Sequence, residues 1–238
     1  IINNYDCRMI KYANIKFFNK VSDIILKPGI YLFGILVGIS LYYAFYDSPP
    51  DYQQGEVVRV MYIHVPFAWI SIGIYCTIGI LSIFAITWKS IISYIYAQSL
   101  SHIGIVYTGL TLITGMLWGK PIWGAYWVWD ARLTSMLILL IIYLGYISIC
   151  NSTSLHRSIK PASVFAMIGV INIPIIKFSV NIWYSLHQGP SIFRMEGIAI
   201  ASSMLKPLML MFATMTLLTI ILFIIRTKTL IIRFRRQN

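Results

Sequence analysis

The sequence predicts an all-α integral membrane protein in which six transmembrane helices form a single polytopic domain, residues 1–238. Hydrophobic residues make up 58% of the chain and charged residues only 11%. Several uninterrupted apolar runs reach the roughly 18 to 20 residues that cross about 30 Å of hydrocarbon as a helix. A membrane β-barrel would instead alternate polar and apolar residues along each strand, and these runs do not alternate.

The apolar runs are separated by polar connectors, among them 47–51, 151–154 and 188–191, which contain turn-forming residues. We expect the six spans, from first to last, at about residues 29–46, 60–87, 100–118, 133–150, 161–180 and 204–225.

Lysine and arginine are divided unevenly between the two sides of these spans. One side carries Arg8, Lys11, Lys16, Lys20, Lys27, Lys89, Arg157, Lys160, Arg226, Lys228, Arg233, Arg235 and Arg236. The other side carries Arg59, Lys120, Arg132, Lys177, Arg194 and Lys206. Because the side richer in Lys and Arg is normally the inner one, both termini are expected inside. The net charge of +12 is then explained by topology and by lipid headgroups rather than by nucleic-acid binding.

The outer connector at residues 118–132 is unusually rich in tryptophan. Four of the seven tryptophans of the chain lie there, at positions 118, 123, 127 and 129. An interfacial belt is the ordinary explanation for tryptophan in a membrane protein, but a belt distributes the rings over all spans and both faces. Gly119 and Gly124 would let the backbone approach a partner closely, and a helical turn would put Trp123 and Trp127 on one face. We interpret the segment as a binding surface.

The four histidines divide between the two sides of the membrane. His102 and His156 lie near the inner ends of spans, where a hydrogen-bonded structural imidazole is the simplest interpretation. His64 lies at the outer mouth of the second span and His187 in the outer connector after the fifth. These two imidazoles therefore share a face with the tryptophan segment, which makes them candidates for a ligand pair.

Two imidazoles beside an indole-rich wall fit haem better than a bare metal ion. A zinc or copper site would need three or four nearby His, Cys or carboxylate groups. Two neutral histidines can fill the axial positions of a haem iron, and Trp and Tyr rings can cover the macrocycle. Arg59 and Arg132 stand at outer span ends, where a planar guanidinium could pair with a propionate. The absence of a CxxCH motif argues against covalent haem attachment.

Three segments of the chain resemble a known family. WGKPIWGAYWVWDARLTS is similar to the WWD signature of the haem-handling proteins of cytochrome c biogenesis. MYIHVPFAW and NIWYSLHQGPSI, together with six spans and this length, resemble the cytochrome c maturation protein C family (CcmC, haem exporter protein C). The resemblance covers nearly the whole chain.

This resemblance implies a haem carrier rather than an enzyme. It implies that haem b is held transiently and without a covalent bond on the outer face, with His64 and His187 as axial ligands of the iron. Around the haem it places Trp118, Trp123, Trp127, Trp129, Asp130 and Arg132. It also implies delivery to the haem chaperone CcmE, with the small subunit CcmD and the ABC transporter subunits CcmA and CcmB as further partners. The chain has no Walker A motif, so ATP chemistry is expected on other chains.

Location and two rival functions are left open by the sequence. Isoleucine clearly outnumbers leucine, as is typical of AT-rich organellar genes, which favours the mitochondrial inner membrane over a bacterial plasma membrane. A transmembrane haem exporter would need a polar or broken-helix pathway at mid-membrane, for which Pro174 and Lys177 are the only indication. A b-type electron-transfer protein would normally carry its two histidines on facing helices inside the bilayer.

Overall fold

The computed structural model describes residues 15–183, 185–187, 189, 192, 197 and 199–237. Arg8, Lys11 and Arg194 of the charge count lie outside the described residues, as do most of residues 188–191. The described part is helical apart from loops and one isolated bridge between Asp51 and Gly55. Its elements are α1 (Ile15–Tyr42), η2 (Tyr43–Asp47), η3 (Glu56–Val60), α2 (Met61–Thr87), α3 (Ile91–Trp123), α4 (Ala131–Ser152), α5 (Leu155–Gly169), α6 (Asn172–Ile182) and α7 (Ser202–Gln237).

Six stretches are long and apolar enough to cross a membrane, which confirms the predicted fold class. They are Phe17–Asp47, Glu56–Thr87, Ile91–Trp123, Ala131–Ser152, Leu155–Ile182 and Ser202–Arg235. All six begin before the ranges expected from hydropathy, because a helix can continue beyond its apolar run. The chain is therefore an integral membrane protein.

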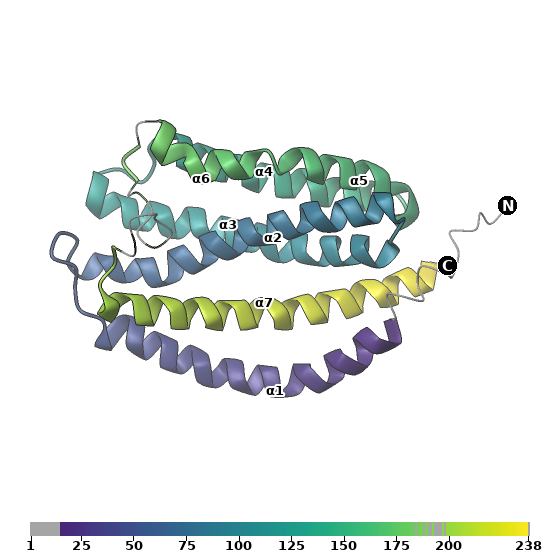
Figure 1. Ribbon diagram of the computed structural model, residues 1–238, viewed down its shortest axis with the longest axis horizontal. Coiled ribbons are helices and arrows are strands. Elements are labelled where there is room, and N and C mark those ends of the chain that lie inside the picture. The colour runs from purple at the N-terminus through teal and green to yellow at the C-terminus, as the bar shows by residue number, and fades with distance from the viewer. Residues whose placement is uncertain are drawn as a thin grey trace.

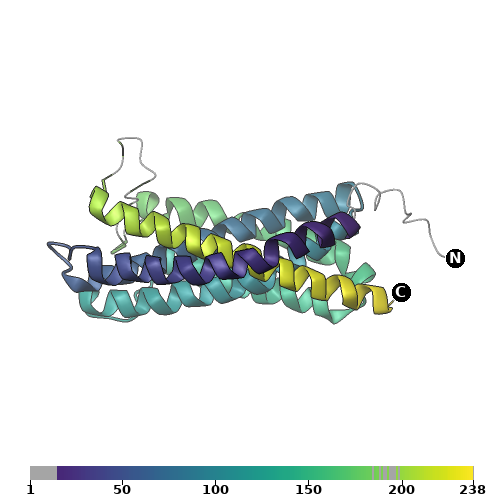
Figure 2. The same cartoon turned by 90° about the horizontal axis from the view of Figure 1, so that it is seen from below.

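The helices lie side by side in one elongated bundle (Figure 1). α2 packs against α3, α5 and α7, and α4 packs against α3, α5 and α6. α1 packs mainly along α7, at the edge of the bundle, and much of its apolar surface is exposed. Figures 1 and 2 both show the start of α1 and the end of α7 at the same end of the bundle. The segment Trp118–Arg132 lies at the opposite end, which we call the tryptophan end.

Two fully buried tyrosines join the central helices at mid-bundle. The Tyr143 hydroxyl donates to the Ser71 carbonyl at 2.7 Å and the Tyr75 hydroxyl to the Ala166 carbonyl at 3.3 Å, so neither buried polar group lacks a partner. Their rings meet edge to face with centroids 5.1 Å apart. The tyrosines fit because glycines face them: a Cβ on Gly104 would lie 2.3 Å from Tyr143, and one on Gly169 would lie 2.1 Å from the Tyr75 hydroxyl.

The fifth expected span, about 161–180, is interrupted by a break at Val170–Ile171 between α5 and α6. Pro174 explains the break, because proline has no amide hydrogen to donate to the carbonyl four residues earlier, here that of Val170, and its ring crowds that carbonyl. The Val170 carbonyl instead accepts from the amide of Ile173 at 2.9 Å. Asn172 at the break is buried, and its side-chain nitrogen donates to the Ser135 carbonyl of α4 at 2.9 Å.

α3 extends through residues 118–123 of the segment 118–132, which was expected to form a connector. It ends at Trp123, where Gly124 adopts a left-handed conformation with φ of 77° and its amide closes the last turn on the Lys120 carbonyl. Glycine is the residue that takes this conformation without steric cost. Trp118 and Trp123 therefore lie on the helix and Trp127 on the loop that follows, so the expectation that one helical turn would hold Trp123 and Trp127 is wrong.

Candidate functional site

Two imidazoles that are far apart in the sequence meet at the tryptophan end. His64 lies in the first turn of α2, and His187 lies in the segment between α6 and α7. Their ring centroids are 6.2 Å apart and the rings are inclined at 67°. The antiparallel pairing of α2 with α3, and of α4 with α6, brings these segments to the same end of the bundle.

His64 is buried and held by residues of the neighbouring helix α3. Its Nδ1 lies 3.1 Å from the Thr114 hydroxyl oxygen, and its ring meets Trp118 edge to face with centroids 5.6 Å apart. The Thr114 hydroxyl donates its single hydrogen to the Leu110 carbonyl at 2.7 Å, so toward His64 it can only accept. Nδ1 of His64 therefore carries the ring proton, and Nε2 keeps a lone pair for a ligand. A Cβ on Gly115 would lie 3.0 Å from the His64 ring, so glycine makes this close approach possible.

His187 is held by side chains around the start of α4. Asp130 caps α4 by accepting from the Leu133 amide at 2.7 Å through Oδ1, while its Oδ2 accepts from the Ser185 hydroxyl. The Ser185 oxygen in turn accepts from the backbone amide of His187 at 3.1 Å. The His187 ring packs edge to face on Trp123, with centroids 5.4 Å apart.

The electrostatics of His187 favour its neutral form. Burial, with smaller contributions from Arg132 and His64, lowers the pKa of the His187 imidazole to about 3, against a partly opposing effect of Asp130. Because only neutral imidazole offers a lone pair to a metal, the ring is ready to act as a ligand at neutral pH.

Of the four tryptophans, Trp118 and Trp123 each pack on one imidazole, whereas Trp127 and Trp129 pack on each other. Trp118 donates from Nε1 to the Gln54 side-chain oxygen at 2.9 Å, which fixes its ring beside His64. Trp127 and Trp129 form an edge-to-face pair with centroids 5.4 Å apart. The Nε1 donor of Trp127 is buried without an acceptor among the described residues, whereas the Trp129 side chain is 76% exposed.

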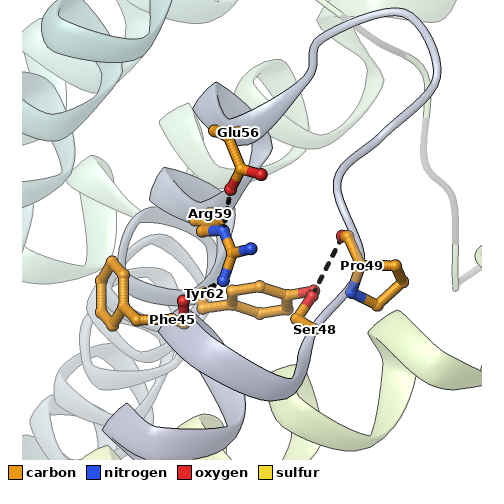
Figure 3. Close-up of polar contacts among 6 residues, drawn as sticks. All are labelled: Phe45, Ser48, Pro49, Glu56, Arg59 and Tyr62. Carbon is orange, nitrogen blue, oxygen red and sulfur yellow. Dashed lines mark hydrogen bonds and ion pairs between the residues drawn. The ribbon is translucent and has the colours of Figure 1, made fainter.

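The two arginines of the sequence analysis are placed differently. Arg132, in the first turn of α4, lies close enough to both His64 and His187 to act on them electrostatically. Arg59 contacts the Phe45 carbonyl and the Glu56 carboxylate (Figure 3), which ties η2 to η3. No contact between Arg59 and the imidazole pair occurs among the described residues.

The remaining two histidines lie far from this site, toward the opposite end of the bundle. The Nδ1 of His102 bonds the Gln98 carbonyl of its own helix at 2.9 Å. His156 packs on Phe234 with ring centroids 5.5 Å apart.

Three residues of the site were not found by sequence reasoning: Gln54, Thr114 and Ser185. Thr114 carried a weak signal, because it lies one turn before Trp118 and so shares a helix face with it. Gln54 carried none, since its partner Trp118 is more than fifty positions away, and the bond of Ser185 to Asp130 spans a similar distance in the sequence.

The two imidazoles and the indole donor of Trp127 suit a metal ion that is held within a larger ligand better than they suit a bare metal ion. No three His, Cys, Asp or Glu side chains gather into a metal site within the described part of the chain. Two imidazoles on opposite faces of one metal ion have centroids about 6 Å apart, because each metal–nitrogen bond is about 2 Å. The His64–His187 separation matches this value, and the unpaired Trp127 donor would suit an anionic group of the same ligand.

Comparison with known proteins decides the family. The model of the CcmC family, described as heme exporter protein C, matches residues 8–238. The chain belongs to this family. A ccmC-like mitochondrial protein of Marchantia polymorpha, described as a putative cytochrome c biosynthesis protein, is 45% identical over 85% of this chain and 86% of its own length. Heme exporter protein C of Bradyrhizobium diazoefficiens is 42% identical over 86% of this chain and 78% of its own length. Heme exporter protein C of Escherichia coli K12 is 36% identical over 86% and 82% respectively.

Membership of the CcmC family supports a role in haem handling for cytochrome c maturation, as a transport component rather than a catalyst. The resemblance noted on the sequence segments is thereby confirmed.

Proposed function

We propose that this protein holds haem b without a covalent bond at the tryptophan end, between His64 and His187, and delivers it to the haem chaperone CcmE. The observation that carries the proposal is the ring contact between these two histidines at a separation that suits one metal ion between them. When bound, haem would supply an iron with two axial positions. All the groups that would hold and orient the haem belong to side chains of this protein.

Each residue of the site has a distinct part in this proposal. His64 and His187 are the axial ligands, and Trp118 and Trp123, which pack on one imidazole each, cover the macrocycle beside them. Arg132 and the free Trp127 donor are suited to the propionates, because both can donate to carboxylate oxygens. Trp129, largely exposed, belongs to the surface that a partner would contact. Arg59 stays a prediction as a propionate partner, since its described contacts are with Phe45 and Glu56.

We propose the mitochondrial inner membrane as the location, with the tryptophan end on the outer face. The excess of Lys and Arg at the opposite end supports this orientation, and the relatives from Marchantia polymorpha and Arabidopsis thaliana are named mitochondrial. CcmD, CcmA and CcmB are the further partners that we expect.

Transport of haem across the bilayer is the alternative, and the break between α5 and α6 favours it, because transporters build sites at broken helices. However, the break is closely packed. A Cβ on Gly79 of α2 would lie 2.5 Å from the Val170 side chain, and Asn172 is satisfied by α4. The electron-transfer alternative is disfavoured because His64 and His187 meet at the end of the bundle and not at its centre.

The test of haem holding and delivery is co-purification. The protein is purified from membranes that contain CcmE, with and without haem synthesis. We expect bis-histidine haem absorption from the purified protein, and CcmE in the preparation only when haem is present. Equal recovery of CcmE without haem would contradict delivery, and absence of haem under both conditions would contradict the site.

A further inference from the structure

We propose that the two histidines are unequal ligands: His64 stays on the iron while His187 is the ligand that leaves, and Asp130 and Ser185 set how readily it does so. This inference rests on the proposed function, because it concerns the order of events at the same site. It adds positioning roles for Thr114, Asp130 and Ser185.

His64 is fixed by two regular helices. It lies in α2, its Nδ1 proton is directed at Thr114 of α3, and Trp118 packs on its ring. Gly115 allows α3 to approach the imidazole closely. A second polar partner on a metal-binding histidine fixes both the tautomer and the ring orientation. Moving His64 off the iron would therefore break its contacts with both Thr114 and Trp118 of α3.

His187 is held by fewer constraints than His64: its ring packs on Trp123, as that of His64 packs on Trp118, but its ring nitrogens make no hydrogen bond within the described part of the chain. It lies outside the helices, and its backbone is attached to the start of α4 through the Ser185 hydroxyl. Ser185 donates its only hydrogen to Asp130, so its lone pair is left to accept the His187 amide. Rotation about the backbone near Ser185 would withdraw the imidazole without disturbing a helix.

Asp130 joins the WWD segment to this attachment. One of its oxygens caps α4 and the other holds Ser185, so a partner that displaces the loop before α4 would also loosen His187. In this ligand exchange, the bond between the His187 nitrogen and the iron breaks and the nitrogen keeps its lone pair. A neutral nitrogen donor of the haem acceptor then forms a new bond to the iron with its own lone pair, and no electron or proton is transferred.

The experiment measures how fast an added ligand replaces a histidine in the haem-loaded full-length protein. Cyanide is mixed with wild type and with Ser185→Ala, Ser185→Thr, Asp130→Asn and Thr114→Val, and binding is followed by absorption. Asn at position 130 keeps an oxygen for the Leu133 amide but cannot accept from Ser185 with its amide nitrogen, so it separates the cap from the attachment. Ser185→Thr keeps the hydroxyl and is the matched control.

We expect Ser185→Ala and Asp130→Asn to accelerate cyanide binding about tenfold, with a melting temperature near wild type, and Ser185→Thr to behave like wild type. Thr114→Val should leave the cyanide rate within about twofold of wild type. Equal acceleration by Thr114→Val and Ser185→Ala would overturn the inequality of the ligands, as would no acceleration by either Ser185→Ala or Asp130→Asn. If His64→Ala and His187→Ala both kept the wild-type haem spectrum, the proposed function itself would fail, which is a different result.

Discussion

The two ends of the bundle use the same residue types for different purposes. At the end near the termini, polar side chains satisfy one another between helices: the Tyr94 hydroxyl bonds that of Ser158 at 2.8 Å, and Thr227 bonds Ser99 at 2.9 Å. At the tryptophan end, the Thr114 hydroxyl contacts the ring of His64, and Ser185, which is bonded to Asp130, accepts from the backbone amide of His187. Histidines at the two ends therefore differ in where their contacts come from. His102 is bonded within its own helix, whereas His64 is held by a neighbouring helix.

The largest expected effect is an all-or-none difference in accessibility between the two ends. Tyr126 and Ser154 are both exposed and lie at opposite ends. Single cysteines introduced at these positions, in a background without Cys7, Cys76 and Cys150, should react with a membrane-impermeant thiol reagent from opposite sides of the membrane. Labelling of both from one side would contradict the six-span topology.

Removing either outer histidine should abolish six-coordinate haem. We expect His64→Ala or His187→Ala to lower the haem content of the purified protein at least tenfold, because each removes an iron–nitrogen bond. Added imidazole should restore part of the spectrum by filling the vacant position. His102→Ala and His156→Ala are the controls from the other end and should keep the wild-type spectrum. An equal loss of haem in His102→Ala and His156→Ala would contradict the assignment of the haem ligands to the tryptophan end.

Different residues of the tryptophan end should affect the binding of haem and its delivery to CcmE. We expect Trp123→Ala, Trp127→Ala and Asp130→Ala to lower the yield of haem-linked CcmE several-fold more than they lower haem content. Arg132→Ala should instead reduce haem content itself, because it leaves a propionate unpaired at a low-dielectric boundary. Arg59→Ala tests the remaining propionate assignment in the same way.

Haem content and CcmE adduct are measured in the same membranes for each of these variants. Parallel loss of both quantities in all five would mean that the segment is one pocket without a division of tasks.

A smaller effect is expected on acidification. The pKa of His187, lowered to about 3 by burial, lies below the usual value near 6.5, so its neutral form persists in the folded protein between these limits. The bis-histidine spectrum at pH 5 should therefore match that at pH 7. In the haem-free protein the unfolded chain binds the proton more readily than the folded one, so stability falls as pH falls from about 6.5 toward 3. A spectral midpoint near pH 6.5 would show that His187 behaves as an exposed imidazole.

The sequence was sufficient for the features that depend on apolar runs and residue types. The number of spans follows from hydropathy, and the pairing of His64 with His187 at one end follows from counting spans. The break at Val170–Ile171 was marked only by Pro174, because hydropathy is the same on both sides of it. The extension of α3 to Trp123 was missed because tryptophan and glycine suggested a connector. The contacts of Thr114 with His64, of Ser185 with Asp130 and of Arg59 with Phe45 join segments that are distant in the sequence, and no local pattern encodes them.

The tyrosine–glycine contacts at mid-bundle have a consequence for where haem can come from. Tyr143 fills the space beside Gly104, and Tyr75 fills the space beside Gly169. A flat macrocycle could therefore pass between the central helices only if these helices moved apart. Haem would then reach the tryptophan end either from the aqueous phase on the same side of the membrane or through the lipid leaflet on that side. The supply of haem would thus depend on its diffusion on one side of the membrane. The rate of cytochrome c maturation would depend on how often a haem binds at the tryptophan end.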